Sequence, residues 1–405
     1  MFKNLAYRIY DFFTLKQIRY LKYFIELEKK TIPELEEFQI EKLRDLSKKL
    51  PGISIDNWED FYKLPITKKQ DLVNSPLYPD ENIKTHETSG STGEPRVIWV
   101  PEDSWNRKDA IFMRSWIHMG RKNQKVLRLI SGDPKYSKYD YFRNVFPKNY
   151  KTLDKSYADW VVKNKPFLIH GPGGSIRQLC EYLIEMEEFE VLKNLKIHWC
   201  SESSEGHKDR LEKFVKEFHE QFGMAELPTV GATDGLGNLR VLMEQGVIEV
   251  LDDNNKPVGE DEEGFITVTD FNNYQTPIIR YQTGDRCKIK KITTNDLEYY
   301  VIYDIIGRGV DYYYGPEVKK PIGWWIVAPI SHILSDVISK WRCEINIKNR
   351  ELTLYVEFKE EKNFEKLEPY ANWVQENLGL KTKFVEAQKE SYDIYWKNKL
   401  VKVIN

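Results

Sequence analysis

The sequence has little cysteine, no long apolar run and no excess of charge of either sign. Its four cysteines, Cys180, Cys200, Cys287 and Cys343, stand far apart without a Cys-x-x-Cys pair, which excludes a disulfide framework and a zinc knuckle. The formal net charge is −2, which leaves no electrostatic footprint for nucleic acid. No segment approaches the roughly 18 consecutive apolar residues of a membrane span, and the N-terminus lacks a secretory signal. We therefore expect a soluble, cytoplasmic protein with free thiols.

One basic segment stands out against this neutral background. Between Phe2 and Phe24, aromatic and aliphatic residues alternate with Lys and Arg in a helical rhythm. A basic amphipathic helix of this kind lies on an anionic membrane in some proteins and packs on its own domain in others, and the second case is the commoner. The sequence leaves both interpretations open.

Apolar periodicity predicts an α/β fold. Residues 1 to about 50 read as helices, and Pro51-Gly52 ends the run. Further on, short apolar runs typical of strands alternate with helical patterns, which favours a mainly parallel sheet in this part of the chain. The predicted strands are Val126–Ile130, Pro166–His170, Leu195–Trp199 and Leu227–Gly231, and the predicted helices are Arg177–Glu188 and Lys208–Phe222.

The last third of the chain changes character twice. Gly246–Ile306 is rich in strand patterns, and the composition changes after Arg308. In the last stretch, Glu344–Lys348 and Leu352–Phe358 predict paired strands and Phe364–Leu378 predicts a helix. The prediction is a large N-terminal domain of mixed sheets with flanking helices over residues 1–306, with a helical lead-in over 1–50, and a small mobile α+β C-terminal domain over 307–405.

The densest motif is Thr88-Ser89-Gly90-Ser91-Thr92-Gly93-Glu94-Pro95. Glycines let backbone N–H groups approach an anion closely, and Ser and Thr hydroxyls add neutral donors, so the segment predicts a phosphate-binding loop. It lacks the Gly-Lys-Ser/Thr ending of the P-loop, which argues against a Walker site. The alternative interpretation is a flexible Ser/Gly linker.

Four segments together resemble the acyl-adenylate-forming enzymes, the superfamily of acyl-CoA synthetases, luciferases and peptide-synthetase adenylation domains. The phosphate loop is followed in the same order by Val230-Gly231-Ala232-Thr233-Asp234-Gly235, by Tyr281-Gln282-Thr283-Gly284-Asp285-Arg286 and by Gly307-Arg308-Gly309-Val310-Asp311. Val230 and Asp234 stand where the superfamily has Tyr and Glu. The lead-in Leu64-Pro65-Ile66-Thr67-Lys68-Lys69-Gln70-Asp71-Leu72 is similar to that of the phenylacetate-CoA ligase-like branch, which includes CapK-like proteins.

The resemblance implies a two-step ligase that needs ATP and Mg²⁺. A small carboxylic acid, aromatic acids included, would be activated to an acyl-adenylate with release of pyrophosphate. The acyl group would then pass to a thiol, such as CoA or a carrier protein. One alternative keeps adenylation and ends in an amide, as in siderophore, conjugate or surface-polysaccharide pathways. The other is a non-catalytic nucleotide-binding protein.

The resemblance also assigns roles to residues. The ATP-binding set would be Ser89, Gly90, Ser91, Thr92 and Gly93 on the β- and γ-phosphates, Gly231, Ala232 and Thr233 near the α-phosphate, Asp285 on the ribose hydroxyls and Arg308 on ribose and phosphate. Asp234 would bind Mg²⁺, Asp311 would lie at the hinge, and Lys399 would bridge the substrate carboxylate and the α-phosphate. Catalytic roles would thus fall to Thr233, Arg308 and Lys399, with Lys402 as the rival lysine.

Each assignment has a plainer alternative. Residues 231–235 also fit a tight turn with Asp as a cap, Arg308 a surface ion pair, and Lys399 an ordinary basic tail.

The acid pocket has the weakest sequence signal. Ligands of open α/β sheets bind at the carboxyl ends of strands. The loops at such positions offer Ser131, His170, Gly173, Ser201, Glu202 and Gly231 as candidate substrate contacts. His170 fits a core position equally well, and the glycines near 173 fit a tight loop.

Overall fold

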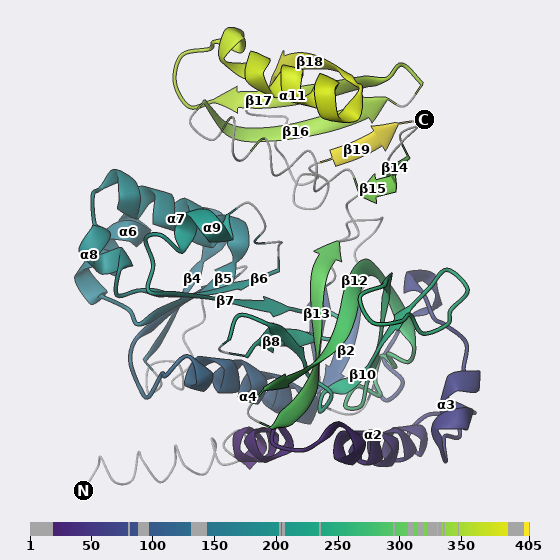
Figure 1. Ribbon diagram of the computed structural model, residues 1–405. Coiled ribbons are helices and arrows are strands. Elements are labelled where there is room, and N and C mark those ends of the chain that lie inside the picture. The colour runs from purple at the N-terminus through teal and green to yellow at the C-terminus, as the bar shows by residue number, and fades with distance from the viewer. Residues whose placement is uncertain are drawn as a thin grey trace, which may run out of the picture. The chain divides into compact units, whose positions relative to one another are not determined.

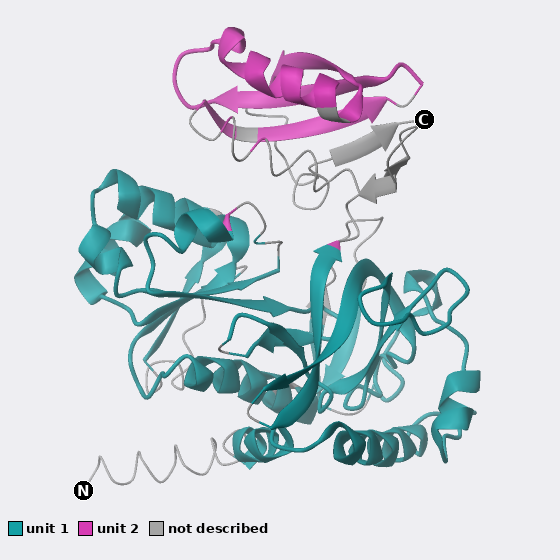
Figure 2. Cartoon of the chain, in the orientation of Figure 1, with its two compact units in different colours: residues 1–88, 97–204, 208–305 teal, residues 89–96, 205–207, 306–405 magenta. Residues whose placement is uncertain are grey.

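A computed structural model describes most of the chain, and its elements are shown in Figure 1. The described residues divide into two compact units (Figure 2). Unit 1 holds those up to Ile305 apart from His207, and unit 2 holds those from Ile306 onward. The predicted boundary residue, Gly307, lies outside the described residues, which are 19–79, 82–87, 97–130, 144–201, 204, 207–234, 236–294, 296–306, 312–314, 319–321, 330, 334, 337–346, 348–387 and 401–404.

The N-terminal part of unit 1 is helical, as predicted. Residues 19–27 are helical, and α2 spans Ile32–Ser47. Thr31 and Glu34 form a capping box, in which the Thr31 N–H donates to Glu34 Oε2 at 2.9 Å. The apolar face of the first helix is buried, because Phe24 is 1 % exposed and joins the main core cluster of unit 1. Tyr20, Leu21 and Phe24 therefore pack on the protein's own core. Residues 1–18 of the basic segment lie outside the described residues, and the two interpretations of that segment stay predictions.

A single sheet of eleven strands forms the centre of unit 1. Five of its strands are mutually parallel: β3 Val126–Ile130, β4 Val145–Asn149, β5 Leu168–Pro172, β6 Lys196–Cys200 and β7 Glu217–Phe222. The others are β8 Gly231–Thr233, β9 Leu239–Val241, β10 Gly246–Leu251, β11 Glu263–Asp270, β12 Tyr281–Thr294 and β13 Leu297–Ile306. The order is β10-β11-β12-β13-β9-β8-β7-β6-β5-β3-β4. The predicted mixed α/β architecture is confirmed.

Helices cover both faces of the parallel strands (Figure 1). On one face, α6 (Lys155–Asn164) and α7 (Gly173–Glu185) pack on Leu127, Ile169 and Ile197. On the other, α4 (Glu102–His118) packs on alternate strand residues, with Trp116 against Val126 and Leu168. The alternation follows from the period of two in a strand, which sends neighbouring side chains to opposite faces.

Several short elements complete the described part of unit 1. The strands β1 (Ile83–Glu87) and β2 (Val97–Pro101) pair antiparallel, and α3 spans Trp58–Lys63. The shorter helical elements are η1 Lys69–Asp71, η2 Tyr150–Thr152, α8 Phe189–Leu192 and α9 Lys208–Leu211.

Two predicted elements were wrong. The helix predicted over Lys208–Phe222 is confined to α9, and Glu217–Phe222 is a strand. Its apolar spacing fits a helix, but Phe218 also alternates with polar neighbours, and pairing between β6 and β8 decides the outcome. The strand predicted over Leu227–Gly231 begins only at its last residue, because residues 225–230 form bends that connect β7 to β8.

Unit 2 contains the predicted α+β arrangement. Its four-stranded sheet has the order β18-β17-β16-β19, from β16 Ile338–Asn346, β17 Glu351–Phe358, β18 Lys381–Glu386 and β19 Val401–Ile404. The helix α11 (Glu368–Leu378) follows η3 (Phe364–Leu367) and ends at Gly379, whose φ of +63° suits glycine. A separate pair is formed by β14 Tyr312–Tyr314 and β15 Lys319–Pro321.

Each unit has its own apolar core. In unit 2, Leu354, Tyr370 and Val374 are fully buried between sheet and helix. The four cysteines are free: Cys180, Cys287 and Cys343 are buried and Cys200 is half-buried. Among the described helices, none combines the length and the apolar character that crossing a membrane requires.

Candidate functional site

The motif at residues 231–234 forms strand β8 and the start of the turn into β9. Gly231 allows the strands to approach, because a Cβ there would lie 3.1 Å from Leu239 Cγ and 3.3 Å from Ile302 Cδ1. Ala232 is 7 % exposed. The Thr233 hydroxyl accepts from the Glu220 N–H at 2.7 Å and donates to the Glu220 carbonyl at 3.1 Å. The threonine therefore ties β8 to β7.

Asp234 is held by four hydrogen bonds, two at each carboxylate oxygen. Oδ1 accepts from the backbone N–H groups of Leu236 at 2.8 Å and Asn238 at 3.1 Å. Oδ2 accepts from Asn238 Nδ2 at 3.1 Å and from the Tyr299 hydroxyl at 2.6 Å. A carboxylate offers about four lone-pair positions, so this set of donors fills them.

The surroundings of Asp234 do not fit a resident metal. Over the part of the chain that the structure describes, no group of three or more His, Cys, Asp or Glu residues is arranged to hold a metal ion. Mg²⁺ requires near-ideal octahedral oxygen coordination at short distances, and the filled carboxylate has no position to give it. In this arrangement the Asp234 carboxylate serves the turn and offers no oxygen to a metal ion.

The second motif lies on β12. Gly284 has a φ of +85°, which glycine adopts without strain, and the Asp285 N–H donates to Thr283 Oγ1 at 3.0 Å. Thr283 and Asp285 are 3 % and 8 % exposed. Tyr281 donates to Glu226 at 2.8 Å from a buried position. The pairing of β11 with β12 shifts register at this point, so Gly284 and Asp285 lie in a β-bulge within the sheet.

The lead-in segment is fastened to this strand. The Thr67 N–H donates to the Arg280 carbonyl, and Thr67 accepts from the Gln282 N–H, both at 2.9 Å. Thr67 Oγ1 also donates to the Ile279 carbonyl at 2.8 Å. One residue of the lead-in therefore acts as a short parallel strand beside Tyr281. The lead-in segment therefore holds the strand that carries Asp285.

A buried arginine reinforces the same junction. Arg280 donates through Nη1 to the carbonyls of Tyr62 and Leu64, at 2.7 and 2.8 Å. Its Nη2 lies 2.9 Å from Glu249 Oε1, and its Nε lies 3.2 Å from Oε2. Burial raises the pKa of Glu249 above its ordinary value, and the Arg280 charge opposes this rise.

Two candidates for the acid pocket lie in packed interior positions. His170 is 5 % exposed, its ring contacts Phe112 and Trp116, and its Nδ1 lies 3.0 Å from His198 Nδ1. Gly173 begins α7, where a Cβ would lie 2.1 Å from the Trp199 ring. The core interpretation of His170 fits these contacts, whereas Gly173 lies in a helix against Trp199 and not in the tight loop that was the alternative for it.

The remaining candidates are dispersed. Ser201 is exposed, has a φ of +69°, and its Oγ lies 3.6 Å from Cys200 Sγ. Ten candidate residues lie outside the described residues: Ser89, Gly90, Ser91, Thr92, Gly93, Ser131, Glu202, Arg308, Asp311 and Lys399. Their roles stay predictions.

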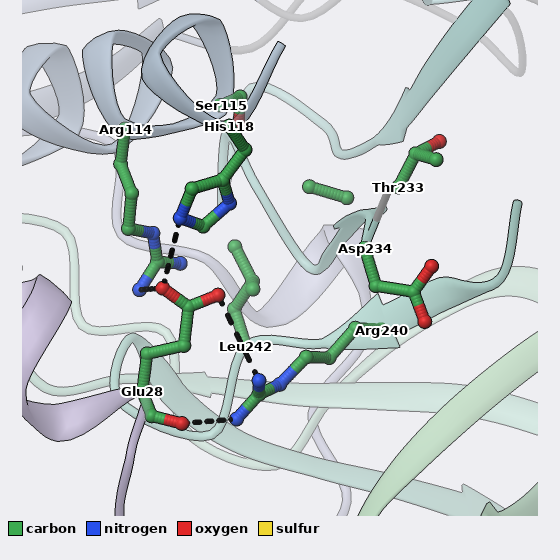
Figure 3. A pocket seen from close by; sticks show the side chains of 9 residues that line it. Glu28, Arg114, Ser115, His118, Thr233, Asp234, Arg240 and Leu242 are labelled. Carbon is green, nitrogen blue, oxygen red and sulfur yellow. Dashed lines mark hydrogen bonds and ion pairs between the residues drawn. The ribbon is translucent and has the colours of Figure 1, made fainter. Parts of the chain in front are cut away.

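A small cavity adjoins the 231–234 motif (Figure 3). Its volume is about 10 Å³, the room of roughly one water molecule. Its walls combine motif residues with polar residues of the N-terminal segment, α4 and β9, namely Glu28, Arg114, Ser115, His118, Ala232, Thr233, Asp234, Arg240 and Leu242. The candidates His170, Gly173 and Ser201 do not line this cavity.

Glu28 is the centre of the charges around this cavity (Figure 3). Its Oε2 lies 3.1 Å from His118 Nε2 and 4.0 Å from Arg114 Nη1, and its Oε1 lies 3.7 Å from Arg240 Nη1. Burial disfavours the Glu28 carboxylate, but the His118 hydrogen bond and the two arginines outweigh it, so the pKa lies below its ordinary value. Glu28 is therefore ionised at neutral pH.

The same arginines hold the first helix and the motif turn. Arg114 donates to the Phe24 carbonyl at 3.2 Å, and Arg240 donates to the Glu28 carbonyl at 2.7 Å, near the C-terminal end of the helical residues 19–27. Arg240 also lies over the Tyr299 ring, 4.6 Å from its centroid. Through Tyr299 and Asp234, the network connects the N-terminal helix with the β8–β9 turn.

Sequence reasoning missed this network. Glu28, Arg240 and Tyr299 belong to no motif and are far apart in the chain. The one available signal is the i,i+4 spacing of Arg114 and His118, which places two basic side chains on one side of a helix.

Comparison with known proteins rests on structure alone. No family model and no curated protein matches the sequence. Solved structures of acyl-CoA ligases and related adenylating enzymes share its fold, so the chain has the fold of the acyl-adenylate-forming ligases. The fold that the motif resemblance implied is confirmed.

Three of these structures illustrate the likeness. A 2-hydroxyisobutyryl-CoA ligase in the postadenylation state, in complex with R3-HIB-AMP, matches with a TM-score of 0.74 and 18% identity over 93% of this chain and 90% of that one. The same ligase with 2-HIB-AMP and CoA in the thioesterification state matches with a TM-score of 0.60 and 19% identity over 93% and 91%. ATP-bound MatB from Rhodopseudomonas palustris matches with a TM-score of 0.54 and 16% identity over 77% and 68%.

Proposed function

We propose that this protein is an AMP-forming acid ligase that activates a small carboxylic acid with ATP. One observation carries the proposal. Residues 231–233 of the first motif form β8 and residues 281–286 lie on β12 of the same sheet, with β9 and β13 between them, in a chain that has the ligase fold. Two sequence motifs with the same implied ligand thus share one layer of the structure.

The proposed first step joins the acid to the nucleotide. An oxygen of the substrate carboxylate attacks the α-phosphorus of ATP, the bond from that phosphorus to the β-phosphate oxygen breaks, and pyrophosphate leaves. Residues 89–93 would hold the β- and γ-phosphates, Asp285 would accept hydrogen bonds from the ribose, and Lys399 would stabilise the charge that develops between the reactants. Mg²⁺ would neutralise phosphate charge when bound with ATP.

The proposed second step transfers the acyl group to a thiol such as CoA. The thiolate sulfur attacks the acyl carbon, and AMP leaves with the electron pair of the broken C–O bond. Support for a thiol comes from the structural neighbour solved with 2-HIB-AMP and CoA in the thioesterification state. We place the chain in the phenylacetate-CoA ligase-like, CapK-like branch on the strength of the 64–72 lead-in. A carrier-protein thiol and an amine are the alternative acceptors.

The test is exchange of labelled pyrophosphate into ATP with the purified protein across a panel of aryl, aliphatic and amino acids. We expect exchange with one class of acid and a loss of orders of magnitude in Lys399→Ala, because that cation acts mainly in the transition state. Lys402→Ala is the matched control and should keep its activity. ATP binding without exchange, with every acid, would favour the non-catalytic alternative.

If Lys402→Ala is active and Lys399→Ala is not, Lys399 is the adenylation lysine. The reverse result would assign that role to Lys402, three residues further along the chain. Addition of CoA, a carrier protein or a panel of amines to the active mixture, with the acyl product identified by mass spectrometry, then distinguishes thioester from amide formation.

A further inference from the structure

The turn that holds Asp234 occurs a second time in the molecule. At Asp234, the carboxylate accepts from the N–H groups two and four residues on, and its own N–H donates to the Asn238 carbonyl at 3.0 Å. At Asp252, the carboxylate accepts from Asn254 and Lys256 at 2.8 Å each, and its N–H donates to the Lys256 carbonyl at 2.8 Å. Asp252 lies in the exposed turn between β10 and β11.

Comparison of the two turns distinguishes the hydrogen bonds that close the turn from those that are particular to Asp234. In the β10–β11 turn, the aspartate closes a turn by satisfying two backbone donors, as Asp does in many such turns. Asp234 makes the same bonds and then uses its second oxygen for Asn238 Nδ2 and the Tyr299 hydroxyl. The extra pair distinguishes this turn from the surface turn.

Tyr299 is itself held in place. Its ring lies under the guanidinium of Arg240, whose other contacts are the carboxylate and carbonyl of Glu28. The Tyr299 hydroxyl donates to Asp234 Oδ2 at 2.6 Å. Tyr299 on β13 thus supplies the donor to Asp234 Oδ2, and Arg240 on β9, which is itself bound to Glu28, holds the Tyr299 ring.

We infer that Asp234 anchors the β8–β9 turn and that Tyr299 is its positioning partner, so that magnesium bound with ATP is held without direct coordination by this carboxylate. The inference rests on the proposed function for its ATP complex. It differs from the role that the motif resemblance implies, because a carboxylate with four donors must lose at least one before it can accept a metal.

The variants Asp234→Asn, Tyr299→Phe and Asp252→Asn test this inference. The first keeps Oδ1 for the two backbone donors and removes the acceptor that Tyr299 uses. The second keeps the carboxylate and removes one donor. The third removes charge from the matching surface turn and serves as the control. Thermal unfolding in EDTA and ATP affinity across a series of Mg²⁺ concentrations are measured for each.

We expect Asp234→Asn and Tyr299→Phe to lower the unfolding midpoint by several degrees in EDTA, and Asp252→Asn to lower it less. The Mg²⁺ concentration that gives half-maximal ATP affinity should change by less than twofold in all three. A tenfold rise in Asp234→Asn alone, or an Asp234→Asn protein as stable as the wild type, would overturn the inference.

The two proposals fail separately. Absence of pyrophosphate exchange with every acid counts against the ligase function and leaves the unfolding result in EDTA unaffected. If Asp234→Asn does not fold, Tyr299→Phe decides the case. If Asp234 coordinated magnesium directly, removal of the Tyr299 hydroxyl should make ATP-bound magnesium bind more tightly. If Asp234 only anchors the turn, Tyr299→Phe should lower the unfolding midpoint and leave magnesium binding unchanged.

Discussion

Gly173 illustrates how a residue that suggests a binding site from sequence can serve packing instead. Its hydrogen faces the indole of Trp199, and a Cβ would overlap ring atoms at 2.1 to 2.4 Å. Trp199 is 2 % exposed and fills the space beside the first turn of α7. Gly171 is similar, because a Cβ there would lie 2.6 Å from Leu129 Cβ. These glycines allow a helix and strands to pack closely.

Gly173→Ala should destabilise unit 1 by about 1–3 kcal/mol, the usual cost of overpacking a rigid interior. Urea unfolding at neutral pH would measure the change. In a Trp199→Leu background, the same substitution should cost much less, because the ring that it meets is gone. An equal cost in both backgrounds would show that the strain lies elsewhere.

Some residues of the candidate site could be predicted from the sequence and others could not. The motif residues Thr233 and Asp285 could be selected from short local patterns with a known family spacing. Glu28 and Tyr299 could not, because the fold brings Glu28 to Arg240, 212 residues away, and Tyr299 to Asp234, 65 residues away. The hydrogen bond from Tyr299 to Asp234 was equally hidden, since its hydroxyl donor comes from β13, whereas the other three donors lie within four residues of Asp234.

At the scale of elements, the parallel strands carry a row of titratable side chains. His170, His198 and His219 are register partners on β5, β6 and β7, on the face that α4 covers. Trp116 donates to His198 Nδ1 at 3.1 Å, and indole is a donor only, so this nitrogen accepts. His170 Nδ1 must then carry the proton in its contact with the same atom.

The histidine row should make the protein sensitive to acid. Burial lowers the pKa of His170 well below its ordinary value and that of His198 to about 3, and it also lowers the pKa of His219. A lowered folded-state pKa means that the unfolded chain takes up protons first. Stability is therefore full above about pH 6.5 and falls toward pH 3, by about 1.4 kcal/mol per unit of pKa shift.

His198→Asn tests this directly, because the amide oxygen can replace Nδ1 as acceptor and does not titrate. The variant should have a flatter dependence of unfolding free energy on pH between 6.5 and 4, whatever its stability at pH 7. Urea unfolding at a series of pH values measures the slope. A slope equal to that of the wild type would exclude His198 as a source of acid sensitivity.

Helices and strands were predictable where the apolar residues followed either the helical or the strand spacing but not both. The strands β3, β5 and β6 and the helix α7 agree with the apolar runs that predicted them, within a few residues at their ends. The helix predicted over residues 208–222 was wrong because Leu211, Val215 and Phe218 fit a helical period, while residues 217–222 also fit the alternation of a strand. Only the neighbouring strands β6 and β8 decide between the two.

On the scale of the whole molecule, the described chain has two units, each with its own apolar clusters, and one proposed reaction. The sheet of unit 1 carries the Thr233 and Asp285 motifs, and unit 2 carries β19, which directly follows the proposed lysine segment and pairs with β16. The order of motifs along the chain was readable from sequence, because it needs no tertiary information. The division of apolar residues into separate cores required the fold.

The cores also predict the reactivity of the thiols. Burial raises the pKa of Cys180 to about 12 and also raises that of Cys287 and Cys343, so these thiols stay protonated at neutral pH. In the native protein, a disulfide reagent should modify the half-buried Cys200 first. Mass spectrometry of the labelled protein gives the order, and early modification of Cys343 would contradict it.

The three buried cysteines can report how fast the apolar clusters around them become exposed to solvent. Cys180 and Cys287 lie in two apolar clusters of unit 1, whereas Cys343 lies in the cluster of unit 2. A thiol that can be alkylated only when its core opens reports the rate of that opening. Pulsed alkylation of the unmodified chain would thus time the exposure of each unit separately, without any introduced label, and would tell whether nucleotide slows one core or both.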